Sequence, residues 1–459
     1  MSEKNLTSLG AEIATLHAAR TVGRVKMVRA DTVVLSGLAD VACLGDRVEI
    51  TRNNGMPLSG EVLQLDREGV LVMPDESPLG LSLGARAWIS SADEISPADE
   101  WVGRVIDPFG HPMDGRPLMR GPVARPLRNA PPAPVHRRGF GPRIETGMAA
   151  FNTLLPIVRG QRIGLFAGSG VGKSSLLGHL GQHMQADIVV IALIGERGRE
   201  LRDFVENVLG PEGMTRAVVV AATSDRSALV RRRCALTAMT VAEHFRDQGK
   251  QVLLLADSIT RFAEAHREVA IAAGELPALR GFPASTSHLI MSLCERAGPG
   301  GADAGDITGV FSVLVAGSDM EEPIADILRG VLDGHVVLDR QIAERGRYPA
   351  IDLLRSVSRS LPMAASAAEN DMIARVRSLL GTYAKSETMV RAGLYTEGSD
   401  PELDQALRIW AELDMFLAET ETVSIQNSFD RLGLILRRAG QGRAIARTST
   451  DQRAASEKR

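Results

Sequence analysis

The sequence has 459 residues, which is too many for one hydrophobic core, and this length predicts about three domains. Hydrophobic residues at 44% and charged residues at 24% are typical of a globular protein in water. The formal net charge of −3 gives no general electrostatic attraction to nucleic acid or to an anionic membrane, so we expect no nucleic-acid partner.

The cysteines and the apolar runs indicate the cellular compartment of the protein. Cys43, Cys234 and Cys294 have the spacing of neither a metal site nor a disulfide framework, which favours a reducing cytosol. We recognise no signal peptide, and no apolar run approaches the ~20 residues that span a bilayer. We therefore expect a cytoplasmic protein with at most a peripheral membrane role.

Residues 1–20 carry an apolar stripe at helical spacing, formed by Leu6, Leu9, Ile13, Leu16 and Ala19. Such a stripe is compatible with a short helix packed on its own domain. It is equally compatible with a segment that docks on a partner or on a membrane surface.

Residues 21–95 contain six short β-type runs that are separated by turn residues. The runs lie at 23–28, 32–35, 46–50, 61–65, 69–73 and 85–89. Short strands at near-even spacing predict a small closed barrel. The barrel sequence has few aromatic residues and no basic stripe, which favours a packing module over a ligand-binding one.

Residues 96–145 are rich in turn residues, including Pro131, Pro132 and Pro134. Such composition is typical of a semi-rigid connection. We expect this segment to be a linker that leads into the next domain.

Residues 162–177 carry the most specific pattern of the chain. An apolar run at 163–167 passes into a glycine-rich loop, and an apolar-periodic helix starts near Lys173. This order predicts a phosphate-binding loop, because backbone N–H groups can wrap a polyphosphate only where glycine allows unusual φ/ψ values. The nucleotide-binding residues are Gly168, Ser169, Gly170, Val171, Gly172, Lys173, Ser174 and Ser175.

Two side chains of this loop have specific expected roles. Lys173 would neutralise the β/γ-phosphate oxygens of ATP, and the Ser174 hydroxyl would bind Mg²⁺. Ala167 stands where the strict pattern has its first glycine. Lys173 is the only lysine between Lys26 and Lys250, so its presence here is not a matter of composition.

Residues 146–364 alternate between apolar strands and helices. The further apolar runs lie at 188–194, 217–221, 252–257, 311–315 and 335–338. Near-continuous apolar strands predict a parallel sheet that helices cover on both faces, and ligands of such sheets lie beyond the carboxyl ends of the strands.

Two carboxylates follow strands of this sheet. Asp257 ends one apolar strand, where a carboxylate can hold Mg²⁺, although it could also simply cap the next helix. Glu196 ends another and could orient and deprotonate an attacking water. From spacing alone, a solvated loop glutamate is an equally good interpretation of Glu196.

Strand patterns stop near residue 365. Asp400 and Pro401 have the pattern of a helix start, and apolar residues follow at helical spacing up to Leu417. We expect a helical C-terminal domain at 365–440 and a polar tail at 441–459.

Six segments together resemble the protein-export ATPases of the bacterial flagellum and of type III secretion, which are relatives of the rotary ATP synthase subunits. They are FAGSGVGKS (166–174), GERGRE (195–200), LLLADSITRF (253–262), LRGVLDGHVVL (328–338), RYPAID (347–352) and SVSR (356–359). The resemblance runs from about Arg24 to Leu417. It implies a multidomain α/β fold with an N-terminal small β-barrel, a central RecA-like P-loop ATPase domain with a parallel sheet, and a C-terminal helical domain.

The resemblance also assigns roles to single residues. It makes Glu196 the water-activating carboxylate and Asp257 the acid on the Mg²⁺ side. Arg197 falls beside the γ-phosphate. Tyr348 falls where the family packs an aromatic ring against adenine, with an ordinary core tyrosine as the alternative. Arg359 takes the place of an arginine finger that reaches the nucleotide of the neighbouring subunit.

The same resemblance implies a Mg²⁺-dependent ATPase that assembles as a homohexameric ring. The implied partners are regulator and stalk proteins of the export apparatus, export substrates and their chaperones, at the cytoplasmic face of the inner membrane. One loop departs from the family, because Arg280-Gly-Phe-Pro-Ala-Ser285 stands where relatives carry Lys-Gly-Tyr-Pro-Pro-Ser. The contacts of that loop are therefore not predicted.

Three classes of protein fit these features. The first is an export ATPase, and the loop sequence 166–174 favours a flagellar system over an injection apparatus. The second is a hexameric nucleic-acid translocase, which net charge and sparse aromatic residues disfavour. The third is a non-catalytic rotary ATPase subunit, which Glu196 disfavours because non-catalytic relatives lack that carboxylate.

Overall fold

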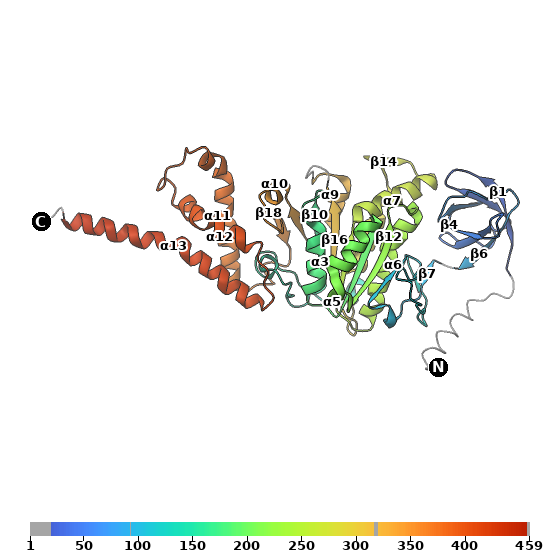
Figure 1. The fold of residues 1–459 in the computed structure, drawn as a ribbon, viewed down its shortest axis with the longest axis horizontal. Helices are drawn as coiled ribbons and strands as arrows, with labels where there is room; N and C mark the ends of the chain where they lie inside the picture. The colour runs from blue at the N-terminus through green and yellow to red at the C-terminus, as the bar shows by residue number, and fades with distance from the viewer. Residues whose placement is uncertain (1–19, 92, 316–319, 457–459) are drawn as a thin grey trace.

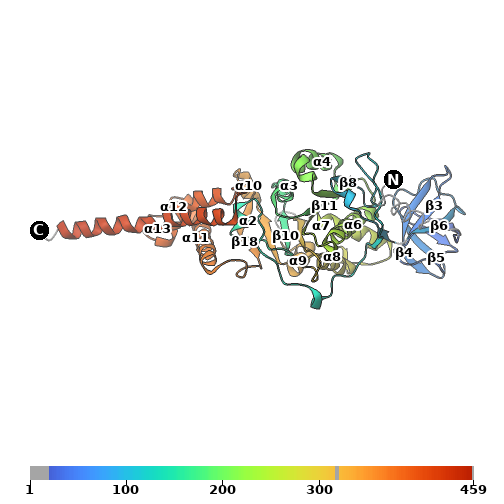
Figure 2. The ribbon, with the colours of Figure 1, turned by 90° about the horizontal axis from the view of Figure 1, so that it is seen from below.

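The computed structural model describes residues 20–91, 93–315 and 320–456, with the backbone alone for Ser91, Leu279 and residues 441–456. The described chain is elongated, with a β-barrel at one end, a sheet covered by helices in the middle and a group of helices at the other end (Figures 1 and 2). The fold class predicted from the sequence is confirmed. The docking segment expected at 1–20 lies outside the described residues except for Arg20.

The N-terminal barrel closes in the order β1-β2-β5-β4-β3-β6. Its strands are β1 (Gly23–Val28), β2 (Val33–Ser36), β3 (Arg47–Thr51), β4 (Pro57–Asp66), β5 (Gly69–Pro74) and β6 (Arg86–Ser91). Alternate residues point inward, so that Val33, Leu35, Val48 and Ile50 are fully buried. The six predicted runs thus form the predicted barrel.

The central sheet has the order β18-β17-β10-β16-β13-β11-β12-β8. In chain order its strands are β8 (Arg104–Ile106), β10 (Arg162–Ala167), β11 (Ile188–Glu196), β12 (Ala217–Thr223), β13 (Val252–Asp257), β16 (Ile307–Leu314), β17 (Gly334–Leu338) and β18 (Ile351–Ser358). Every pairing between neighbours is parallel except that β18 runs antiparallel to β17. The carboxyl ends of the parallel strands therefore meet at one edge.

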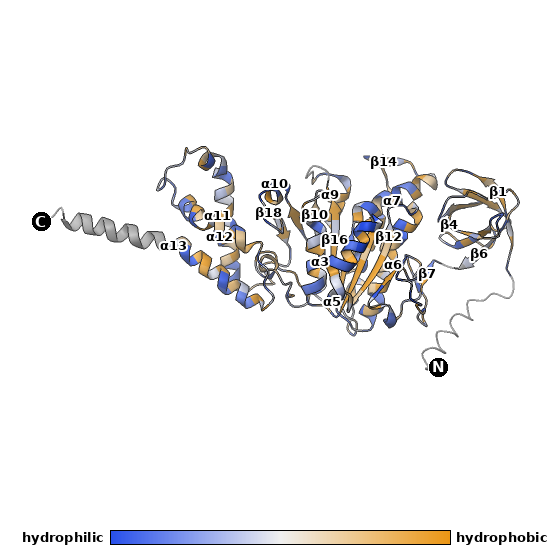
Figure 3. Ribbon diagram, viewed as in Figure 1, coloured by the Kyte–Doolittle hydropathy of each residue, from blue (hydrophilic) through white to orange (hydrophobic). Residues whose placement is uncertain are grey.

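Helices cover both faces of the sheet. Along β11, Val189 and Ile191 face the core that holds α3 (Lys173–His183), whereas Val190 and Ala192 face the core of α6 (Ala228–Asp247). The second core also holds α7 (Ile259–Ala272), α8 (Ser285–Arg296) and α9 (Pro323–Val331). Burial on both sides explains why these strands are apolar at nearly every position, as the hydropathy colouring shows (Figure 3).

Residues 96–145, which we interpreted as a linker, contribute strands to two sheets. β8 joins the edge of the central sheet beside β12, and β7 (Glu94–Ile95) pairs with β9 (Arg125–Pro126). Two short 3₁₀ helices lie in this part of the chain, η1 (Asp99–Trp101) and η2 (Pro134–His136). The segment is therefore built into the domain that it leads to.

A buried network of charges joins the barrel to the central domain. Glu61 of β4 accepts hydrogen bonds from Arg232 of α6 at 2.6 Å and from Arg128 at 2.7 Å. Phe109 lies between the guanidinium groups of Arg47 and Arg233, which are 4.9 and 4.8 Å from its ring centre. These contacts tie the two domains together through paired rather than isolated charges.

Three helices form the C-terminal domain, α11 (Ala367–Arg391), α12 (Pro401–Phe416) and α13 (Ile425–Ser456). Ser366 and Glu369 form a capping box at the start of α11, and Asp400 caps α12. Helix α13 continues through residues 441–456, where the sequence predicts a polar tail. Among the described helices, none is both long and apolar enough to cross a membrane.

The remaining short elements lie around the central sheet. They are α2 (Ala149–Asn152), α4 (Gly198–Asp203), the π-helical turn η3 (Phe204–Leu209), α5 (Gly210–Met214), β14 (Pro277–Leu279), β15 (Phe282–Pro283) and α10 (Arg340–Glu344).

Candidate active site

Three predicted groups meet at the carboxyl edge of the central sheet. The glycine-rich loop follows β10, Glu196 ends β11 and Asp257 ends β13. Leu193 of β11 pairs with Asp257 in the parallel register, so the two carboxylates end neighbouring strands. This edge is where parallel α/β sheets place their ligands.

The loop has the backbone that phosphate binding needs. Gly170 and Gly172 have φ values of +76° and +86°, which side chains rarely allow. A Cβ atom added at Gly170 would meet nothing within 4 Å, whereas one at Gly172 would come within 3.0 Å of the Tyr348 ring. Helix α3 begins at Lys173, so its free N–H groups face the loop.

Asp257 connects the loop to the sheet. Its Oδ1 accepts hydrogen bonds from Lys173 Nζ at 2.5 Å and from Ser312 Oγ of β16 at 2.6 Å. The side chains of Lys173 and Asp257 are 10% and 4% exposed, which makes this a nearly buried ion pair. Ser312 was not predicted, because its hydroxyl in the mostly apolar strand β16 gives no specific signal.

A cavity of about 120 Å³ lies beside this ion pair. It is lined by Ser174, Glu196 and Asp257, whose side chains carry oxygen atoms, and by the apolar residues Phe204 and Val208 of η3. Mg²⁺ prefers oxygen ligands and is usually held by one or two protein groups together with substrate phosphates. The side chains of Ser174 and Asp257 therefore fit a Mg²⁺ ion that arrives with ATP.

Glu196 lies in an environment suited to a general base. The pKa of its carboxyl group is raised to about 7, first by burial and then by the Asp257 charge, while Lys173 acts in the opposite direction. Glu200 also raises this pKa. A carboxylate whose pKa is close to neutral pH can both take up and release a proton under working conditions.

Tyr348 lies on the other side of the loop. Its side chain is half exposed and lines a pocket of about 800 Å³ together with Phe416 of α12 and Ile435 of α13. This ring is beside Gly172, as the contact of the added Cβ shows. The pocket is large enough for a nucleoside base, in keeping with the role predicted for Tyr348.

Arg197 is not drawn into this cluster. It is the N-cap residue of α4, its side chain is 76% exposed, and its Nη1 contacts Glu200 Oε1 at 3.3 Å.

Arg359 lies at the end of the sheet where β10 begins, opposite the end where β10 leads into the phosphate loop. It follows β18, and its backbone N donates to Asp333 O at 3.0 Å, next to the first residue of β10. The six residues of β10 separate this edge from the phosphate loop by about 20 Å, which is far beyond the reach of an arginine side chain. Arg359 therefore cannot serve the loop of its own chain.

The divergent loop around Arg280 forms the turn between β14 and β15. Arg280 has a φ of +47°, and the Arg267 guanidinium stacks on Phe282 at 5.0 Å. Arg267 belongs to the chain's own α7, so this stacking contact joins the loop to that helix.

Two family models match the chain. Residues 147–358 match the nucleotide-binding domain of the ATP synthase alpha/beta family, and residues 365–433 match the C-terminal domain of the type III secretion ATPase EscN.

Similar proteins cover nearly the whole chain. The flagellum-specific ATP synthase of Caulobacter vibrioides is 43% identical over 94% of this chain and 99% of its own length. That of Salmonella typhimurium is 40% identical over 94% and 97%. The assembled ATPase EscN of the enteropathogenic E. coli type III secretion system has a TM-score of 0.84 and 37% identity over 90% of this chain and all of that one. With this sequence, this fold and these groups at the sheet edge, the chain belongs to the family of flagellum-specific and type III secretion ATPases.

Proposed function

We propose that this protein is the ATP-hydrolysing motor of a flagellar type III export apparatus. The observation that carries the hydrolytic part is the meeting of Lys173, Glu196 and Asp257 beside a phosphate loop at one sheet edge. Relatives named flagellum-specific support the flagellar assignment. The similarity to EscN keeps the injection apparatus as the second candidate.

The phosphates of ATP are held by the loop backbone at 168–175 and by Lys173. Gly170 and Gly172 have positive φ values, which glycine adopts readily because it has no side chain. The same lack of a side chain lets a phosphate approach their backbone N–H groups. The Lys173 ammonium lies 2.5 Å from Asp257 Oδ1, so the carboxylate holds it at the mouth of the loop. Tyr348 packs against the adenine in the adjoining pocket.

Ser174 and Asp257 would hold Mg²⁺, which would neutralise charge on the phosphates of ATP. Ser312 fixes the Asp257 carboxylate from the sheet side through its 2.6 Å hydrogen bond. Glu196 orients the attacking water and accepts its proton, and its raised pKa makes that transfer reversible near neutral pH. The apolar wall of Phe204 and Val208 limits access of other water to this cavity.

The site is completed by a second copy of the chain. Arg359 lies about 20 Å from its own loop and is exposed. Its Nη2 donates to Arg329 O at 3.1 Å, and we propose that the guanidinium exchanges this exposed contact for the loop of a neighbouring subunit. A planar, permanently charged group there stabilises charge that develops on the γ-phosphoryl. A head-to-tail contact of this kind closes into a ring, and we propose a homohexamer. Arg197 is exposed next to Glu196, and we propose that it joins the ATP site when the ring assembles.

The partners that we propose for this chain are those expected from its similarity to the export ATPases. EscN has been solved in complex with its central stalk EscO, and we propose an equivalent stalk protein for this chain. Regulators of the export apparatus, export substrates with their chaperones, and the cytoplasmic face of the inner membrane complete the proposed surroundings.

Glu196→Gln tests the hydrolytic assignment. The substitution keeps the size of the side chain and removes the base, so ATP binding should persist while turnover falls by roughly 10²-fold or more. Steady-state ATPase rates measured beside fluorescent-nucleotide binding separate the two effects. Glu206→Gln, at an exposed glutamate paired with Arg202, is the matched control and should keep the rate. Wild-type turnover in Glu196→Gln would remove the base from this mechanism.

A further inference from the structure

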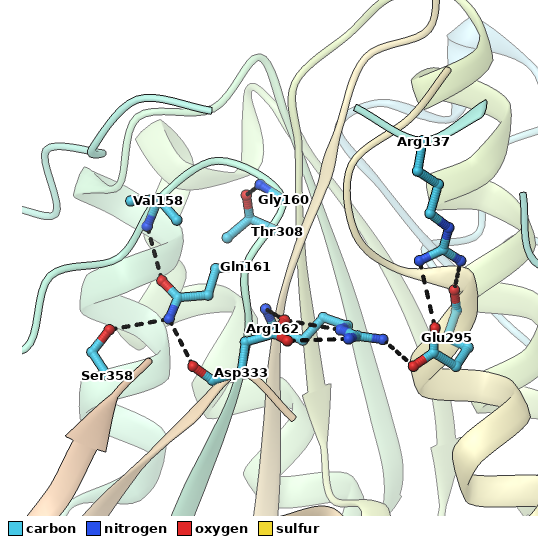
Figure 4. Close-up of polar contacts among 9 residues, drawn as sticks. All are labelled: Arg137, Val158, Gly160, Gln161, Arg162, Glu295, Thr308, Asp333 and Ser358. Atoms are coloured by element: carbon cyan, nitrogen blue, oxygen red, sulfur yellow. Dashed lines mark hydrogen bonds and ion pairs between the residues drawn. The ribbon is translucent and has the colours of Figure 1, made fainter. Parts of the chain in front are cut away.

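A polar network lies at the edge of the central sheet opposite the phosphate loop (Figure 4). It joins the residues that precede β10 to the end of β18, where Arg359 begins. Its side chains are those of Arg137, Gln161, Arg162, Glu295, Asp333 and Ser358, and the hydrogen bond between Thr308 and Gly160 lies beside it as a separate contact. The mechanism above uses none of these side chains.

Gln161 is the centre of this network and is fully buried. Its Nε2 donates to Asp333 O at 3.0 Å and to Ser358 Oγ at 3.1 Å, and its Oε1 accepts from Val158 N at 3.0 Å. The side-chain amide thus uses both donors and its acceptor inside the protein, which is what a buried amide requires.

Both groups that accept hydrogen bonds from the Gln161 amide lead to Arg359. Asp333 O, which accepts from Gln161, also accepts the backbone N–H of Arg359 at 3.0 Å. Ser358 is the residue immediately before Arg359, and its Oγ donates to Pro156 O at 2.6 Å. The Gln161 side chain therefore restrains the backbone of Arg359 through Asp333 on one side and through Ser358 on the other.

The Asp333 end of the network is itself braced. Arg162, the first residue of β10, donates to Asp333 Oδ2 through Nε at 2.9 Å and to Oδ1 through Nη2 at 3.1 Å. Its Nη1 reaches Glu295 Oε1 at 2.6 Å, and Arg137 contacts the same glutamate. A paired guanidinium and carboxylate fix orientation as well as distance. Asp333 consequently has little freedom to move the carbonyl that holds Arg359.

The strands approach each other closely at this point. Gly334 has a φ of +154°, and a Cβ atom added there would lie 2.6 Å from Val357 O. The backbone leading into Arg359 is therefore packed against β17 without room for a side chain.

We propose that Gln161 and Ser358 are positioning residues for Arg359, so that the strand carrying one subunit's phosphate loop also sets the arginine given to the next subunit. This inference rests on the proposed role of Arg359 as a trans finger. An arginine side chain can aim at a phosphoryl group only if its backbone is fixed, and an error of about 1 Å in such a group costs roughly 10²-fold in rate. Gln161, immediately before β10, and Ser358, the last residue of β18, supply that fixation.

Steady-state kinetics on Gln161→Met and Ser358→Ala test the proposal. Gln161→Met keeps the side-chain length and removes all three hydrogen bonds, and Ser358→Ala is a smaller change in case the first variant does not fold. We expect kcat to fall by roughly 10- to 100-fold with KM and fluorescent-nucleotide binding unchanged. Thr308→Val is the control, because Thr308 Oγ1 bonds Gly160 N at 3.0 Å on the same edge without touching Ser358 or Asp333 O. It should keep kcat.

Rings that mix two variants show whether Gln161 acts on the arginine finger or on the phosphate loop of its own chain. Chains with Gln161→Met keep a working loop, and chains with Lys173→Ala keep a working finger. In random rings about one quarter of interfaces combine both, so activity should exceed the sum of the two separate samples. Gln161→Met should also add no further loss to Arg359→Ala, because the two changes remove the same function.

Wild-type kcat in both Gln161→Met and Ser358→Ala, or a full additive loss on top of Arg359→Ala, would overturn the positioning role. Absence of recovery in the mixed rings would overturn it as well, because Gln161 would then act on its own loop. Wild-type activity of Arg359→Ala alone would instead overturn the trans finger and the inference with it. The proposed function and the inference therefore fail in different measurements.

Discussion

The environment of Glu196 predicts a specific pH dependence. The carboxyl group has an ordinary pKa of 4.5, and burial beside Asp257 raises it to about 7. A general base works only when ionised, so activity should rise with pH through this value. With a pKa of about 7 the ionised fraction is about 9% at pH 6 and about 91% at pH 8, which predicts an about tenfold rise in kcat/KM. An ordinary glutamate would give a rise of only about 3% over the same range.

Glu200→Gln separates this effect from the titration of ATP itself. The terminal phosphate of ATP titrates in a neighbouring range and would contribute to any single profile. Because Glu200 raises the pKa of Glu196, its replacement should move the midpoint to lower pH while the substrate titration stays the same. Profiles of kcat/KM, which report the free enzyme, should be compared for wild type, Glu200→Gln and the control Glu206→Gln. Superimposable profiles of wild type and Glu200→Gln, or a flat wild-type profile, would refute the assignment of Glu196 as the titrating base.

Two further predictions concern affinity and stability. Gly172→Ala should weaken nucleotide binding by about tenfold, because a φ of +86° costs an alanine about 1–2 kcal/mol and the new Cβ would press on Tyr348. The control variant Gly330→Ala should bind nucleotide normally, because a Cβ added there meets nothing within 4 Å. Glu243→Ala should lower the free energy of unfolding by about 3–5 kcal/mol, because it leaves the Arg296 guanidinium, 2% exposed, without its carboxylate. Urea denaturation against Glu264→Ala, at a more exposed pair, measures this loss, and equal stability of the two variants would contradict it.

The sequence predicts the regular parts of the fold because their patterns are dictated by burial. Strands β10 to β13 are covered on both faces and read as apolar runs, and the barrel strands alternate. β18 was not predicted, because this edge strand exposes Leu354, Arg355 and Val357, so its pattern is not that of a buried strand. β8 has three residues in a segment dominated by turn residues, and only its pairing with β12 makes it a strand.

The candidate site was predictable to the extent that its residues sit in a local motif. The loop, Glu196 and Asp257 each follow a strand, so their meeting at one edge follows from parallel topology. Ser312 and Gln161 could not be found this way, because a single polar residue in or before an apolar strand gives no spacing signal. Arg359 was proposed only from the resemblance, and the antiparallel course of β18 is what places it away from its own loop.

If Arg359 acts on the neighbouring subunit, a complete site needs two chains. The direct test mixes chains carrying Arg359→Ala with chains carrying Lys173→Ala, each of which should lose roughly 10³-fold or more of the ATPase rate alone. In mixed rings, some interfaces pair an intact phosphate loop with an intact arginine from the neighbour, so ATPase activity should be well above the sum of the separate samples. Wild-type activity of Arg359→Ala by itself, or a mixture no more active than its two parts, would contradict it.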